Sequence, residues 1–242
     1  MGNKAGKQEV GCLYGVGVGP GDPELLTIRA ARILSRVSIV FTPQKDSKSK
    51  SYARHIITGM INKSEQRVID LVFPMKKGTD GLTDYWEKAT KTIWQYLRSG
   101  EDCAFIAEGD SLLYGTFIHV FEMLRKNHPE ARIEVIPGVS SINAAAARAL
   151  FPIATGSERV AILPATYEDR AIRKTLEDFD TVIFLKISTV FDKIFNILKE
   201  LGLVEKCVYV SRCTTEDEKI VKDISDLKGE RLDYLSLLIV RR

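Results

Sequence analysis

The sequence predicts an α/β protein built from two consecutive α/β domains. Short apolar runs of strand length recur along all 242 residues, and the segments between them carry apolar residues at helical spacing. Strands that alternate with helices pair in parallel through right-handed crossovers. After Phe151-Pro152 a second, shorter series begins without a low-complexity linker. We therefore expect domains over residues 1–153 and 154–242, joined near PIATGSE and packed tightly around a ligand cleft.

Five apolar runs are expected to form the strands of the first domain. Between the third and fourth runs, residues 83–98 carry apolar side chains at helical spacing from Trp86 to Leu97, which predicts a helix. Its two tryptophans are therefore expected in the core or at an interface rather than on a stacking platform. The predicted strands are CLYGVGV (12–18), VSIVF (37–41), VIDLVF (68–73), CAFIA (103–107) and IEVI (133–136).

The second domain is predicted to be smaller and to end in strands that pair partly as hairpins. A helical stretch, VFDKIFNILKEL, occupies residues 190–201 and ends before Gly202. The predicted strands are RVAILPA (159–165), TVIFLKI (181–187), CVYVSR (207–212), EKIVKDI (218–224) and YLSLLIVR (234–241).

Composition excludes several classes of function. The 35 Lys and Arg residues against 32 Asp and Glu residues leave a net charge of +3, which does not by itself indicate nucleic acid. No apolar run approaches the roughly 18 residues that span a bilayer, and MGNKAGKQEV lacks the apolar stretch of a secretory signal, so we expect a cytoplasmic protein. The four cysteines form no Cys-x-x-Cys pair and are expected to be buried, reduced thiols, with no metal site.

A glycine-rich stretch, GVGVGPGDPE, closes the first predicted strand. The dinucleotide fingerprint Gly-x-Gly-x-x-Gly fails here, because counting from Gly15 puts Pro20 in the sixth place and counting from Gly17 puts Asp22 there. The second strand also ends in Thr-Pro-Gln, without the acid that would hold a ribose, and there is no Gly-Lys-Ser/Thr of a P-loop. The glycines are instead expected to let the main chain approach another ligand closely.

Acidic residues follow two of the predicted strands. Asp22 is placed to cap a helix that begins with Pro23 and Glu24, so a simple helix start remains one interpretation of this segment. The fourth strand repeats the pattern, because CAFIA runs into the acidic turn at 108–110 before another helical stretch. The fifth strand runs into Pro-Gly and a helix that a serine at 140 or 141 is expected to cap.

These three turns are expected at one edge of the sheet, where the carboxyl ends of parallel strands bind ligands. They offer carboxylates and no lysine or arginine. A phosphate is therefore disfavoured at this edge. A neutral or cationic ligand with hydroxyls and an amine fits better, and S-adenosylmethionine is such a ligand.

Three motifs carry a resemblance to a known family. GVGVGPGDPELLT, GDSLLYGTF at 109–117 and VIPGVSS at 135–141 resemble the tetrapyrrole methylases, which are two-domain enzymes of cobalamin and sirohaem synthesis that use S-adenosylmethionine. The longer spelling LYGVGVGPGDPELLT, FPM at 73–75 and DYLSLLIV near the end are most similar to precorrin-2 and cobalt-precorrin-2 (cobalt-factor II) carbon-20 methyltransferases. The resemblance covers nearly the whole chain and implies the tetrapyrrole methylase fold and a homodimer.

The resemblance also implies where the methyl donor binds, in the cleft between the domains and largely on main-chain groups. Lys186 is included, although Leu185-Lys186 departs from the Met-Lys or Tyr-Met of related enzymes. Ser111 replaces the usual proline, which we expect to cost turn rigidity rather than chemistry. The other implied donor contacts are Pro20, Glu108, Gly109, Asp110, Leu113, Ser140 and Ser141.

The substrates of this family carry acetate and propionate carboxylates, so a substrate trough needs cations. The segment PQKDSKSKSYARH supplies four cations against the single acid Asp46, and among them Lys45 and Arg54 are the first candidates for substrate binding. One interpretation is a solvated loop, and the other is a mobile basic lip that closes over the macrocycle.

The implied reaction is methyl transfer to carbon 20, in which the substrate supplies the nucleophile and the enzyme aligns the reactants and excludes water. No compact catalytic constellation is found, and the three scattered histidines are expected to be structural or exposed. One alternative is a methylase of the same fold that acts on a macromolecule, such as a diphthine synthase or an rRNA methyltransferase. Another is a non-catalytic nucleotide- or RNA-binding module.

Overall fold

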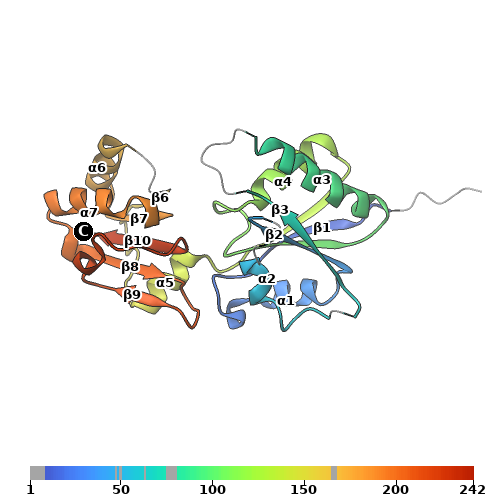
Figure 1. Cartoon of the computed structure of the whole chain (residues 1–242), viewed down its shortest axis with the longest axis horizontal. Coiled ribbons are helices and arrows are strands. Elements are labelled where there is room, and N and C mark those ends of the chain that lie inside the picture. Colours follow the sequence, from blue (N-terminus) through green and yellow to red (C-terminus); the bar gives the residue numbers. More distant parts are fainter. Residues whose placement is uncertain (1–8, 47, 49–50, 63, 75–80, 165–167) are drawn as a thin grey trace, which may run out of the picture. The chain divides into compact units, whose positions relative to one another are not determined.

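A computed structural model describes residues 9–242 except 47, 49–50, 63, 75–80 and 165–167 (Figure 1). The chain divides into two compact units, Met1–Ser140 and Ser141–Arg242. Each unit holds one five-stranded sheet with helices, so the prediction of two consecutive α/β domains is confirmed. The division lies before helix α5 (Ser141–Ala149), whereas the sequence placed the boundary after residue 153, and that boundary stays a prediction.

The sheet of the first unit is parallel throughout, in the order β3-β2-β4-β1-β5. Its strands fall on the five predicted apolar runs, but β2 continues through Pro43 to Gln44, beyond the predicted end at residue 41. The added residues pair with β3 alone, because the pairing of β2 with β4 stops at Phe41. The strands are β1 (Cys12–Gly17), β2 (Ile39–Gln44), β3 (Arg67–Val72), β4 (Cys103–Ala107) and β5 (Arg132–Ile136).

Helices cover both faces of this sheet, with α1 and α2 on one face and α3 and α4 on the other (Figure 1). Successive strand residues alternate between the two cores, so Phe105 packs with α3 and α4 while Ile106 packs with α1 and α2. Burial on both faces explains why the central strands β1, β2 and β4 are continuous apolar runs rather than alternating ones. The helices are α1 (Ile28–Leu34), α2 (Tyr52–Ile56), α3 (Thr83–Arg98) and α4 (Phe117–Asn127), with the 3₁₀ helix η1 (Pro23–Leu25) before α1.

The predicted helix at 83–98 is α3, and its aromatic side chains help to fix α4. Ile93 and Leu97 are fully buried. Trp86 stacks on His119 with ring centroids 4.0 Å apart, and Trp94 stacks on His128 at 4.1 Å. Both tryptophans pack against the core, as predicted, and two of the three histidines have a packing role there.

The second unit has a mixed sheet in the order β6-β7-β10-β8-β9. Only β6 and β7 are parallel, whereas β10 runs antiparallel between β7 and β8, and β8 and β9 form the predicted hairpin-like pair. Helices α6 and α7 share one core with this sheet, and α5 lies against β8. The elements are β6 (Val160–Pro164), α6 (Asp169–Asp178), β7 (Thr181–Leu185), η2 (Ile187–Thr189), α7 (Phe191–Glu200), η3 (Val204–Lys206), β8 (Cys207–Ser211), β9 (Lys219–Val221), η4 (Ile224–Leu227) and β10 (Ser236–Arg241).

All four cysteines are buried, free thiols, as predicted. Burial raises the pKa of Cys103, Cys207 and Cys213 to about 12, so these thiols stay protonated at neutral pH. Within the described part of the chain, no group of three potential metal-ligating side chains comes together. Among the same residues, every helix is too short or too polar to cross a bilayer.

Candidate functional site

Three turns meet at the carboxyl edge of the first sheet. Strands β4, β1 and β5 are neighbours and run in parallel, so the segments that follow them leave the sheet at the same edge. The first two turns are bonded to each other, because the Gly109 N–H donates to the Gly19 carbonyl at 2.8 Å and the Gly19 N–H donates back to Gly109 at 3.2 Å. The sequence prediction that these turns lie together at one edge is confirmed.

Glycine allows the three turns to pack backbone against backbone. A Cβ atom on Gly17 would lie 2.6 Å from the Gly138 nitrogen and 2.7 Å from the Gly109 carbonyl oxygen, which is closer than real Cβ atoms approach. Gly15 has a different neighbour, since its Cβ would overlap the Phe117 ring. The protein itself therefore accounts for these glycines. Gly19 has a left-handed φ of +81°, and a Cβ atom there would lie 3.5 Å from the Leu25 Cβ, which is an ordinary van der Waals contact.

Asp110 joins the second turn to the third. Its Oδ1 accepts from the Leu112 N–H at 2.9 Å within its own turn, and its Oδ2 accepts from the Gly138 N–H at 3.0 Å in the turn after β5. The expected acidic cap of the following helix is wrong, because α4 begins at Phe117 after Thr116 and no side chain caps it. Each carboxylate oxygen accepts one main-chain N–H, and in this way Asp110 fixes the relative position of two turns.

The predicted role of Asp22 as a helix cap is only partly confirmed. Its Oδ1 accepts from the Glu24 N–H at 2.8 Å, and Pro23 stands at the first helical position. The helix that it opens is the three-residue η1, whereas α1 begins at Ile28 and is capped by the Thr27 hydroxyl. Asp22 therefore does not cap the longer helix α1.

Pro20 is buried at the centre of the first turn. Its carbonyl accepts a hydrogen bond from the Tyr52 hydroxyl at 3.2 Å, and Tyr52 is the first residue of α2. The sequence prediction missed this tyrosine. No local pattern marks it, since its partner lies 32 residues earlier in the chain.

The second turn presents an acid and a short apolar surface. Glu108 is exposed, while Gly109 is buried with a left-handed φ of +65°. Leu113 is exposed, and so are Leu112 and Tyr114 on either side of it. Across residues 18–22, 108–116 and 137–140, the charged side chains are all acidic, as the sequence suggested.

The buried hydroxyl of Ser111 is a source of instability that the sequence did not reveal. It is fully buried, and its hydroxyl has no hydrogen-bond partner among the described residues. A buried hydroxyl without a partner is unfavourable. The residue that replaces the usual proline therefore adds a polar penalty to the expected loss of rigidity.

The remaining predicted donor residues fall on both sides of the division between the units. Ser140 ends the first unit, and Ser141 is the first residue of α5 in the second. Lys186 follows β7 with an exposed side chain and a left-handed φ of +56°. Strain of this kind at a residue other than glycine costs of order 1–3 kcal/mol and gathers at ligand sites.

The predicted substrate cations have different surroundings. Lys45 is exposed directly after β2. Arg54, on α2, places Nη1 3.3 Å from both carboxylate oxygens of Asp70, and the buried Thr42 hydroxyl donates to the same carboxylate. Arg54 also borders a small pocket of about 110 Å³ with Thr58, Ile61 and Val68. Of the other two lysines in this segment, Lys48 is exposed and Lys50 lies outside the described residues.

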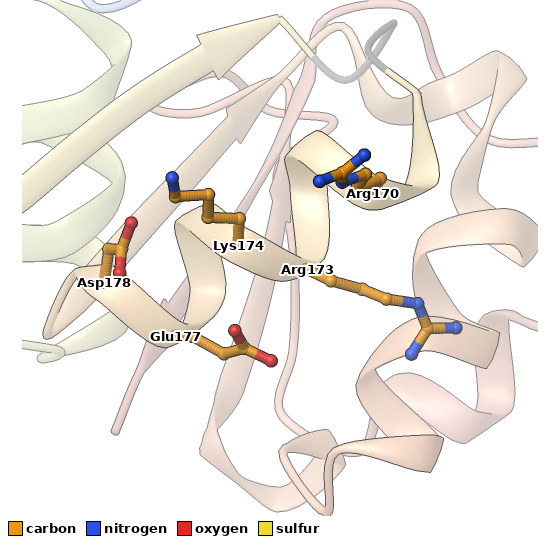
Figure 2. Close-up of a pocket in the computed structure, with 5 residues that line it drawn as sticks. All are labelled: Arg170, Arg173, Lys174, Glu177 and Asp178. Carbon is orange, nitrogen blue, oxygen red and sulfur yellow. The ribbon is translucent and has the colours of Figure 1, made fainter.

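Another depression, of about 510 Å³, is lined by none of the predicted site residues. It lies along α6 in the second unit, and Figure 2 shows its five charged side chains. Arg173 reaches away from the others toward α7, where it pairs with Glu200. The mixture of charges on one exposed helix is typical of a solvated surface. The lining residues are Arg170, Arg173, Lys174, Glu177 and Asp178.

The sequence matches the family described as Tetrapyrrole (Corrin/Porphyrin) Methylases over residues 12–228. A probable cobalt-precorrin-2 C(20)-methyltransferase from Methanocaldococcus jannaschii is 35% identical over 237 residues, which cover 95% of this chain and 96% of that protein. A cobalt-precorrin-2 C(20)-methyltransferase from Salmonella typhimurium is 30% identical, covering 96% and 97%. A precorrin-2 C(20)-methyltransferase from a Sinorhizobium species is 28% identical, covering 96% and 95%.

Solved structures share the fold. The crystal structure of a cobalt precorrin-4 methyltransferase superposes with a TM-score of 0.73 at 24% identity, covering 95% of this chain and 94% of that one. A uroporphyrin-III C-methyltransferase from Thermus thermophilus, solved with S-adenyl homocysteine, gives a TM-score of 0.69 at 21% identity, covering 96% and 98%. At these identities the likeness concerns the arrangement of the chain.

Proposed function

Because the chain belongs to the tetrapyrrole (corrin/porphyrin) methylase family, we propose that it transfers a methyl group from S-adenosylmethionine to carbon 20 of a precorrin-2 ring in cobalamin biosynthesis. The observation that carries this proposal is the similarity, over nearly the full length of both chains, to enzymes named for that reaction. Cobalt-precorrin-2 or cobalt-factor II is the first candidate substrate, because the relatives at 35% and 30% identity are named for the cobalt form. Metal-free precorrin-2 is the second.

The donor is proposed to bind at the edge where the three turns meet. When bound, S-adenosylmethionine supplies an electrophilic methyl group on a positively charged sulfur. An edge whose charged side chains are all acidic suits that sulfonium and the ammonium group. Leu113 offers an exposed apolar surface. The proposed contacts are Pro20, Glu108, Gly109, Leu113, Ser140, Ser141 and Lys186, with Asp110 holding the turns in place.

Alignment is the main contribution proposed for the protein. The attacking carbon belongs to the electron-rich macrocycle, so no side chain needs to act as a nucleophile. The turns that meet at Gly17, Gly109 and Gly138 are rigid, since they pack backbone on backbone. A rigid support holds the reacting methyl group in line with the attacking carbon and lowers the entropic part of the barrier. The product of the donor is S-adenosylhomocysteine.

Methyl transfer is the direct test. Incubation with S-adenosylmethionine and cobalt-loaded or metal-free substrate is expected to add one methyl mass to the ring and to release S-adenosylhomocysteine, as measured by mass spectrometry. Absence of transfer to either ring, with both substrates shown to be intact, would reject the proposal. Methyl label on protein or RNA in a cell extract would instead favour a macromolecular substrate. Salt-dependent RNA binding without any transfer would favour a binding module.

Arg54 and Lys45 are proposed to bind substrate carboxylates. The Arg54 side chain is 45% exposed and its contacts with Asp70 are long, so it can exchange one carboxylate for another. Replacing Arg54 with Gln is expected to raise the KM for the tetrapyrrole about fivefold, since an exposed charge contact of this kind contributes roughly 1 kcal/mol. The Kd for the donor should stay the same in calorimetry.

Asp70→Asn is the matched control for Arg54→Gln. It breaks the same ion pair but keeps the guanidinium, so its KM for the tetrapyrrole should remain at or below the wild-type value. If both variants raise KM equally, the pair serves only to hold α2 against β3, and Arg54 is not a substrate ligand. In keeping with the family resemblance, we further propose that the enzyme works in the cytoplasm as a homodimer.

A further inference from the structure

An ion pair in the second unit ties α5 to the segment between β8 and β9. Arg148, in the last turn of α5, places Nε 2.9 and 3.1 Å from the two carboxylate oxygens of Glu218, and Nη2 lies 2.8 Å from Oε1. The Glu218 side chain is only 9% exposed, whereas Arg148 is 58% exposed. This buried carboxylate therefore meets a guanidinium that reaches in from the surface.

Glu218 also accepts hydrogen bonds from its own segment. The Thr214 N–H donates to Oε2 at 2.7 Å, and the buried Cys213 thiol donates to the carboxylate as well. Burial alone would raise the pKa of Glu218, but the bonds from Arg148 and Thr214 lower it overall. The carboxylate therefore stays ionised at neutral pH and holds all three groups at once.

The segment that Glu218 holds is strained. Arg212 and Thr214 both have left-handed backbones, with φ of +45° and +67°. Side chains other than glycine rarely adopt this conformation, which persists only where the surroundings impose it. Arg212 is held in turn by Asp233, with Nε 2.6 Å from Oδ2. Glu218 and Asp233 thus fix the two ends of a conformation that the chain would not keep by itself.

We propose that Glu218 is a positioning residue for the methyl donor, acting through Arg148 and α5. The inference depends on the proposed function, because it uses the assignment of Ser141 to the donor site. Ser141 begins α5 and Arg148 lies near its end, about 10 Å away along one continuous helix at 1.5 Å per residue. A helix this short moves as a rigid body, so a change where Arg148 is held also moves Ser141. Glu218 itself touches no reacting atom in this scheme.

Calorimetry with S-adenosylhomocysteine tests the proposal. Gln at position 218 keeps the size of the side chain but replaces one acceptor oxygen with a donor, so Arg148 and Thr214 can no longer both be satisfied. Glu218→Gln is expected to raise the Kd for S-adenosylhomocysteine and the KM for S-adenosylmethionine about tenfold. At saturating donor, kcat should stay within twofold of wild type. Arg148→Met should likewise raise this Kd and KM while leaving kcat within twofold of wild type. The double variant should bind S-adenosylhomocysteine no more weakly than either single variant.

Glu200→Gln is the control. It removes an exposed carboxylate of the same unit that pairs with Arg173, and it should leave the Kd for S-adenosylhomocysteine within twofold of wild type. If Glu218→Gln lowers the midpoint of urea unfolding but leaves this Kd unchanged, Glu218 has a structural role only and the proposal is wrong. If the wild-type protein itself fails to bind S-adenosylhomocysteine, the proposed function fails instead, so the two failures are distinguishable.

Discussion

Gly138→Ala is expected to destabilise the first unit by about 3 kcal/mol or more and to abolish donor binding. The added Cβ atom would lie 2.7 Å from the carbonyl carbon of Gly17 and 2.8 Å from its Cα, and closer still to the Gly109 carbonyl oxygen. All three neighbours are backbone atoms, so no side chain can turn aside to make room. The turn after β5 must therefore move away from the other two. Urea unfolding and calorimetry with S-adenosylhomocysteine would measure the two effects.

Gly59→Ala is the matched substitution for this comparison. Gly59 lies in the same unit with no atom within 4 Å of a Cβ at that position, and its φ is not left-handed. The change should leave stability within about 1 kcal/mol of wild type, or raise it slightly by restricting the unfolded chain. If Gly138→Ala were as well tolerated as Gly59→Ala, close packing of the three turns would not be what requires glycine there.

Asp110→Asn is expected to raise the Kd for S-adenosylhomocysteine at least tenfold and to cost about 1–3 kcal/mol of stability. The carboxylate accepts one N–H on each oxygen, from Leu112 and from Gly138. An asparagine has a single acceptor oxygen, so its NH₂ group must face one of these donors. The local bond to Leu112 can be kept, and the bond that joins the two turns is then lost.

Asp22→Asn is the control for the bond between Asp110 and Gly138. Asp22 also accepts from the N–H two residues later, at 2.8 Å, and asparagine is as good a cap as aspartate. This variant should therefore bind S-adenosylhomocysteine like wild type. If Asp110→Asn weakens donor binding without any loss of stability, the carboxylate contacts the donor directly. If it changes neither quantity, Asp110 has no role in the site.

Most strands of both units were predictable because they are short apolar runs between polar turns. The strand predicted at 218–224 is shorter, since β9 is only Lys219–Val221 and η4 begins at Ile224. Burial on both faces of the first sheet selects such runs, and this requirement is visible residue by residue. Helix starts were harder. Asp22 and Asp110 both have the sequence context of a cap, but α1 and α4 begin later, at Ile28 and Phe117. A capping side chain makes the same hydrogen bond in a 3₁₀ turn, a loop and a helix. The residue types alone therefore do not tell these three structures apart.

The residues that we propose to organise the candidate site depend on contacts between distant parts of the chain. Asp110 meets Gly138 across 28 residues, Tyr52 meets Pro20 across 32, and Arg148 meets Glu218 across 70. None of these distances has a period that a sequence pattern can reveal. Arg54 was identified as a cation near the expected site, but its contact with Asp70 became visible only once β3 and α2 were placed.

The motif GVGVGPGDPE shows which conclusions follow from the residue types and which require the folded structure. Its residue types alone excluded a dinucleotide or P-loop site and led to the family, because those conclusions rest on which groups are present and in what order. The reason for each glycine was a matter of three-dimensional packing. Gly15 makes room for Phe117 and Gly17 for the Gly138 backbone, while Gly19 adopts a left-handed backbone. Steric contact is a property of atoms brought together by folding, and a linear sequence does not contain it.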